Sequence, residues 1–161
     1  MNVVISDTSP ISGLIRLNLL ELLPKLYGEL IIPPTVYAEL LNLSVFGYEM
    51  TPLTTASWLK IVPPQNYTLL SQLSQDLDLG EAEAIVLAKE QRATLLIIDE
   101  KKGRAIAREM DLSIVGLLGV LIEAKQKKHI PLIKPLLIEL QKLGFRISPS
   151  LFELVLKEAK E

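Results

Sequence analysis

Short apolar runs alternate with longer helical patterns along this chain, and this alternation most constrains its fold. Residues 3–5, 30–32 and 94–98 show no apolar–polar alternation, which is typical of strands covered on both faces. Because helical patterns separate these runs, the connections between strands would be crossovers, as in a parallel sheet. We therefore predict an α/β fold with three layers, α/β/α, around a central and mainly parallel sheet.

The predicted strands all lie in the first 115 residues, with further short strands near residues 61–62 and 113–115. Helices are predicted over residues 10–23, 35–43, 69–77, 81–91, 101–110, 116–128, 132–143 and 149–160. A chain of 161 residues has the length of one domain. We expect a single domain over residues 1–161, with an α/β core (1–115) and a helical C-terminal part (116–161) packed on it.

Composition excludes several kinds of chemistry. The chain has no cysteine and a single histidine, His129, which excludes disulfides, iron–sulfur clusters and multi-histidine zinc sites. The net charge of -2 excludes a protein that coats DNA as a polycation. The longest apolar stretch, residues 114–122, is shorter than the about 20 residues of a membrane span. We expect a cytoplasmic protein without membrane contact, whose chemistry depends on carboxylates, hydroxyls, lysine or arginine.

Two acidic residues come directly after apolar strands. Asp7 follows the first strand and Asp99 follows the strand at 94–98. The carboxyl ends of parallel strands form the edge where ligands bind in such sheets, so both carboxylates would converge there. The alternative is that each is a turn residue or a helix cap.

Three glutamates are further candidates. Glu81 shares a helical stripe with Ala84 and Ile85, and a carboxylate on a buried stripe is costly unless it is paired or metal-bound. Its place in a first helical turn reduces this cost. Glu83 is about 200° around the helix from Glu81, which indicates a solvent-facing or second-shell position. The pattern around Glu39 favours a solvated helix face.

Clustered carboxylates without histidine or cysteine suit Mg²⁺ or Mn²⁺, and such ions support phosphodiester hydrolysis by activating a water molecule. A calcium loop at residues 76–81 does not fit, because Glu81 stands where the loop glycine belongs. A phosphorylatable receiver domain would need a pair of acids after the first strand, where only Asp7 is present.

Four short motifs contain the candidate acids: Asp7-Thr8-Ser9 with Leu14-Ile15, residues 34–40 with Glu39, residues 80–88 with Glu81, and Ile98-Asp99-Glu100. Together they resemble the motifs of the PIN-domain family of metal-dependent ribonucleases, near the VapC-type toxins of prokaryotic toxin–antitoxin pairs. Family members often carry aspartate where this chain has Glu81. From about Gly116 onward the chain resembles a less-characterised PIN branch, so the alternative function is an inactive PIN-fold module that binds RNA or protein.

The resemblance implies that Asp7, Glu39, Glu81 and Asp99 are catalytic and hold one or two Mg²⁺ or Mn²⁺ ions. Glu83 would lie in the second shell. The implied reaction is cleavage of RNA. No residues are predicted to bind an organic cofactor.

Candidate substrate residues lie near this edge. Lys101, Arg104 and Arg108 share one helical face and would bind RNA phosphates, unless they form an ordinary solvated face. Ser9 would orient Asp7 or a water molecule, or act only as a helix N-cap. The basic run at 125–129 lies at a helix C-terminus, where positive charge is favoured anyway.

The predicted C-terminal helices are very apolar. Residues 132–156 contain more leucine, isoleucine and valine than a small sheet needs to cover it. We expect a homodimer, or an antitoxin segment docked on these helices. The alternative is a third layer of core.

Overall fold

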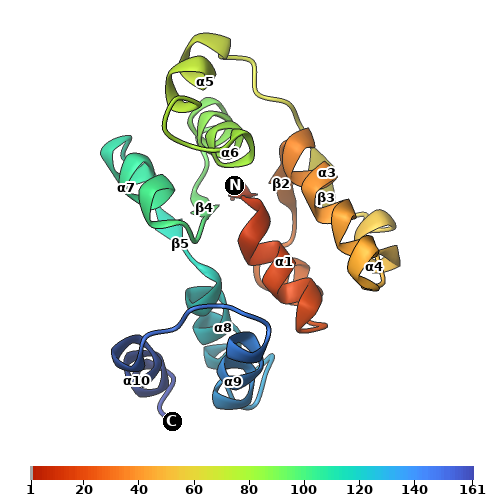
Figure 1. Cartoon of the computed structure of the whole chain (residues 1–161), viewed down its shortest axis with the longest axis vertical. Helices are drawn as coiled ribbons and strands as arrows, with labels where there is room; N and C mark the ends of the chain where they lie inside the picture. Colours follow the sequence, from red (N-terminus) through yellow and green to blue (C-terminus); the bar gives the residue numbers. More distant parts are fainter. Residues whose placement is uncertain (1) are drawn as a thin grey trace.

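The computed structural model describes residues 2–161 and shows a five-stranded sheet in the order β3-β2-β1-β4-β5 (Figure 1). The strands are β1 Val4–Ser6, β2 Leu30–Ile32, β3 Leu59–Ile61, β4 Leu95–Ile97 and β5 Ile114–Val115. Every pair is parallel. The predicted parallel sheet is confirmed, and β1 occupies its centre, between β2 and β4.

Helices cover both faces of the sheet. They are α1 Thr8–Arg16, α2 Leu22–Tyr27, α3 Pro34–Leu41, α4 Thr51–Thr54, α5 Tyr67–Leu73, α6 Leu79–Glu90, α7 Lys101–Glu109, α8 Leu117–Gln126, α9 Lys134–Lys142 and α10 Pro149–Glu158, with the 3-10 helix η1 Asn42–Phe46. Successive strand residues point to opposite faces: Val4 packs in one core cluster with α1 and α8, and Ile5 packs in another with α6 and α7. The three-layer α/β/α prediction is confirmed.

One predicted helix is two. The leucine stripe predicts a continuous helix over residues 10–23, but α1 ends at Arg16 and α2 begins at Leu22. Between them Asn18 adopts a left-handed conformation with φ 59°, which asparagine tolerates better than most residues. Pro24 lies in the first turn of α2, where its missing N–H is not needed. Leucine spacing does not reveal this break because leucines on both sides of it are buried.

The C-terminal helices α8, α9 and α10 group at one end of the molecule (Figure 1). Their buried residues belong to the same cluster as Val4 and Leu14 of the sheet and α1. Among them are Ile133, Leu137, Leu140, Val155 and Leu156. Most of the apolar surplus is therefore a third layer of core, while four large apolar side chains remain exposed: Leu132, Ile138, Leu151 and Leu154.

No helix in the described part of the chain is both long enough and apolar enough to cross a membrane.

Candidate active site

The carboxyl edge of the sheet carries the predicted acidic residues. Asp7 follows β1 directly, and Asp99 is two residues beyond the end of β4. Glu39 comes from α3, after β2, and Glu81 from the first turn of α6. Asp7 and Glu81 are only 4% and 8% exposed. Each acid therefore stands on the element that the sequence predicts for it.

Two glycines show where these carboxylates point. A β-carbon on Gly80 would collide with Oε1 of Glu39 and lie 3.6 Å from Oδ1 of Asp7. A β-carbon on Gly103 would lie 2.9 Å from Oε2 of Glu81. Asp7 and Glu39 thus meet at the first turn of α6, and Glu81 extends toward the first turn of α7.

Hydroxyl groups from the start of α1 hold two of the acids. Thr8 donates to Oε2 of Glu39 at 3.2 Å, and Ser9 donates to Oδ2 of Asp99 at 3.3 Å. The predicted role of Ser9 as N-cap is wrong, because β1 leads straight into the helix and Asp7 takes the cap position. Both hydroxyls are therefore free to bind carboxylates from other elements.

Asp99 also joins the strand to the C-terminal part. The Leu117 N–H, at the start of α8, donates to its Oδ1 at 2.7 Å. The Arg104 guanidinium donates to the Ile98 carbonyl at 2.8 Å, which holds the backbone just before Asp99. Arg104 is half-buried, while Lys101 and Arg108 are exposed, so the three cations of α7 are not one uniform solvated face.

Burial and mutual repulsion raise the pKa values of these acids. Burial, followed by the charges of Asp78, Glu39 and Asp99, raises the pKa of Asp7 to about 7. Burial and then Asp78 hold the pKa of the Glu81 carboxyl well above its usual range. Burial also raises the pKa values of Glu39 and Asp99. The cluster is costly to ionise, and a bound cation would offset this cost.

Asp78 is a residue of the site that the sequence prediction missed. It is the N-cap of α6, and its Oδ1 accepts a hydrogen bond from the Glu81 N–H at 2.9 Å. Its charge contributes to the raised pKa values of Asp7, Glu39 and Glu81. The Asp-x-x-Glu spacing of 78–81 is a variant of the capping box and could have revealed it.

The solvent-facing alternative for Glu83 is wrong. Glu83 is 9% exposed, and its Oε1 is buried without a hydrogen-bond partner. Its charge raises the pKa of Glu39, which places it beside the site. The sequence argument assumed that α6 has one solvated face, whereas every residue from Gly80 to Ala88 is buried.

The donor set fits a hard divalent cation. The candidate ligands are carboxylate oxygens, which Mg²⁺ and Mn²⁺ prefer. The buried Oε1 of Glu83 has no hydrogen-bond donor, so it is one more oxygen that a cation would stabilise. No three Asp, Glu or His side chains among residues 2–161 lie close enough together to form a ready-made metal site. Like charges repel, so an ion would have to draw Asp7, Glu39 and Glu81 toward one another.

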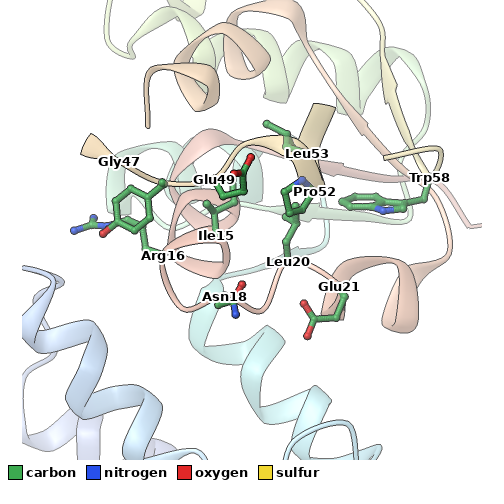
Figure 2. A pocket seen from close by; sticks show the side chains of 11 residues that line it. Ile15, Arg16, Asn18, Leu20, Glu21, Gly47, Glu49, Pro52, Leu53 and Trp58 are labelled. Atoms are coloured by element: carbon green, nitrogen blue, oxygen red, sulfur yellow. The ribbon is translucent and has the colours of Figure 1, made fainter. Parts of the chain in front are cut away.

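A separate pocket of about 400 Å³ lies at the other end of α1, lined by Ile15, Leu53 and Trp58 among others (Figure 2). It contains none of the predicted site residues, and Glu21 and Glu49 are its only acids.

Comparison with known proteins agrees with the fold. The family DUF3368, described as a PIN domain, matches residues 3–161. The chain belongs to the PIN-domain family. No curated protein matches it.

A solved structure with a similar fold is a PilT N-terminus domain protein, SSO1118, from the hyperthermophilic archaeon Sulfolobus solfataricus P2. The two chains share 21% sequence identity, and the TM-score is 0.51. The match covers 77% of this PIN domain and 93% of the archaeal chain. At this identity the likeness shows the fold alone.

Proposed function

We propose that this PIN domain is a Mg²⁺- or Mn²⁺-dependent endoribonuclease. The observation that carries the proposal is the buried Asp7 carboxylate, whose pKa is raised by burial and by three neighbouring acids. Such a cluster, facing the carboxyl edge of a parallel sheet, is unfavourable for stability and suits a site for cations. Family membership supports a nuclease, since PIN domains are commonly nucleases.

In this proposal Asp7, Glu39, Glu81 and Asp99 hold one or two ions. When bound, the metal would supply an activated water and stabilise charge on the phosphate under attack. Thr8 keeps Glu39 oriented and Ser9 keeps Asp99 oriented through the hydrogen bonds that they donate. Glu83 does not bind the ions directly and acts through its charge on Glu39. The exposed Lys101 and Arg108 bind RNA phosphates.

RNA cleavage with and without Mg²⁺ tests the proposal, with Asp7→Asn as the site variant. We expect the variant to lose activity by about 100-fold or more, because the asparagine amide cannot replace the carboxylate charge. Asp111→Asn is the matched control: it removes one exposed aspartate just after α7, at a position with φ 61° that asparagine tolerates. Full activity in Asp7→Asn would contradict the role of Asp7.

The second candidate is a non-catalytic module that binds RNA or protein. The absence of a ready-made metal site in the described residues favours it. Calorimetric titration with Mn²⁺ separates the two candidates. The nuclease predicts binding that Asp7→Asn weakens and Asp111→Asn leaves unchanged, whereas the module predicts no binding by the wild-type protein.

Further parts of the proposal concern partners and organisation. We propose one functional domain over residues 1–161, acting on RNA in the cytoplasm as the toxin of a prokaryotic toxin–antitoxin pair. The exposed apolar residues of the C-terminal part, which could contact a homodimer partner or an antitoxin, are Leu132, Ile138, Leu151 and Leu154. Growth arrest on expression, relieved by a protein encoded beside it, would support the toxin role. A monomeric mass at micromolar concentration would contradict the dimer.

A further inference from the structure

We propose that single-stranded RNA lies in a groove leading from the acidic edge to the α9–α10 connection, residues 143–148, and that Arg146 binds one of its phosphates. This inference rests on the proposed nuclease, since the groove begins at its candidate active site. It extends that proposal by assigning a substrate-binding role to the C-terminal part of the chain.

The groove joins the two regions in one surface. Ser9 and Asp99 line one end of it, and residues 144–147 with Leu151 line the other. Its volume is about 910 Å³, at the upper end of the roughly 300–1,000 Å³ that small-molecule sites occupy. A strand that enters along the α9–α10 connection would therefore arrive at Asp99.

Cations flank the groove at both ends. Lys101 lines it beside Asp99, and Arg146 lines it in the α9–α10 connection. Both side chains are exposed, and neither forms an ion pair within residues 2–161. Cations placed in this way would bind phosphates on either side of the one that is cleaved.

Arg16 has a different role in this groove. Its guanidinium donates to the Leu143 carbonyl at 2.8 Å and lies 5.5 Å from the centre of the Phe145 ring. These contacts fasten the α9–α10 connection to the end of α1. The groove wall that carries Arg146 is therefore held in place against the α/β core.

The apolar part of the groove lining favours a single strand over a duplex. It includes Leu118, Leu143 and Leu151. Unpaired bases can place their faces on an apolar surface, whereas the bases of a duplex are stacked inside it. The cations and the acidic site at the end of the groove favour RNA over an apolar protein segment as the occupant.

The test measures RNA binding by fluorescence anisotropy without metal, in EDTA and roughly 50 mM salt. The probe is a fluorescein-labelled single-stranded RNA of about 12 nucleotides, with a duplex of equal length for comparison. We expect Arg146→Ala to weaken binding about 3- to 10-fold and to lower the salt slope by about 1. Lys157→Ala, an exposed position on α10 outside the groove, should bind like wild type.

A second pair of variants separates groove charge from folding. Leu151→Glu places a negative charge in the groove, yet it completes a capping box with Ser148, whose Oγ already accepts from the Leu151 N–H at 3.2 Å. We expect it to keep the thermal midpoint and to weaken RNA binding about tenfold. Ser150→Glu adds the same charge one residue away, outside the groove lining, and should bind within about twofold of wild type.

Unchanged RNA binding by Arg146→Ala and Leu151→Glu would overturn the inference, as would equal affinity for the duplex. It would also be overturned if the wild type bound no RNA in EDTA and Asp7→Asn bound none in Mg²⁺, which would favour a protein occupant. Groove-dependent binding without cleavage in Mg²⁺ would contradict the proposed nuclease and support the groove. If the wild type cleaved RNA in Mg²⁺ while Arg146→Ala and Leu151→Glu bound RNA as tightly as the wild type, the result would support the proposed nuclease and contradict the groove.

Discussion

Carboxylates in two regions of the molecule have opposite energetics. At the acidic edge, burial and neighbouring acids raise the pKa of Asp7 to about 7. At the C-terminal end, the side chain of Glu161 accepts from the backbone N–H groups of Ile133 and Lys134 at 2.7 and 3.1 Å, and from Lys125 Nζ at 2.8 Å. These hydrogen bonds lower the pKa of Glu161.

The difference shows what each carboxylate contributes. Glu161 has donors of its own and stabilises the start of α9 as a cap would. Asp7 and its neighbours have few donors and repel one another, so in the absence of a ligand they reduce stability. The acidic edge is tolerated because the large apolar cores on both faces of the sheet compensate for it. Measurements of the free energy of unfolding test this contrast.

The largest expected effect is a gain of stability on removing a charge. At pH 8 without metal, Asp7→Asn should raise the free energy of unfolding by about 1–3 kcal/mol, because it removes a buried charge that costs folding energy. Urea denaturation measures it, and Asp111→Asn should stay within about 0.5 kcal/mol of wild type. A loss of stability in Asp7→Asn would show that the carboxylate has partners and would break the contrast.

The pH dependence of the wild-type protein should follow from the same carboxyl. The folded-state pKa of Asp7 is raised from 3.8 to about 7, so the folded protein binds a proton there more tightly than the unfolded chain does. The stability that this proton contributes is fully present below pH 3.8 and is lost as the pH rises through about 7. The metal-free protein should therefore gain about 1–2 kcal/mol between pH 8 and pH 6. The stability gap to Asp7→Asn should narrow over this interval, and a constant gap would contradict the raised pKa.

Gly80→Ala should affect the site more than the fold. The new methyl group would meet the Glu39 carboxylate, while alanine improves helix propensity in α6. We expect Mn²⁺ affinity to fall about tenfold, or about 1.4 kcal/mol, as measured by calorimetric titration. Unchanged affinity would mean that Glu39 does not need its observed position to bind the ion.

The smallest effect is expected at Glu161. Glu161→Gln should lower the free energy of unfolding at pH 7 by about 0.5–1 kcal/mol, since the neutral amide is a weaker acceptor for the α9 N–H groups and for Lys125. The pKa of Glu161 is lowered in the fold, so its contribution is present above the ordinary glutamate value of 4.5 and is lost as the pH falls. The difference from wild type should disappear in acid; a difference that grows in acid would contradict the contrast.

Several parts of the fold and the site were accessible from the sequence for physical reasons. Strands buried on both faces are apolar along most of their length, so the runs at β1, β2 and β4 stand out. An acid that follows such a strand must lie at the carboxyl edge of the sheet. This locates Asp7 and Asp99. Helix periodicity could not locate Glu83, because the pattern assumes a solvated face that α6 does not have.

Local sequence pattern was enough to predict the parallel α/β sheet and the positions of Asp7 and Asp99 at its carboxyl edge, since both depend on residues that are close in the sequence. Other features are visible only in the tertiary structure. Thr8 donates to Glu39, Ser9 donates to Asp99, and Arg104 donates to the Ile98 carbonyl. The tertiary structure also shows that one groove is lined by both Asp99 and Arg146. These relations join side chains from elements far apart in the chain, and packing of the whole domain sets their distances.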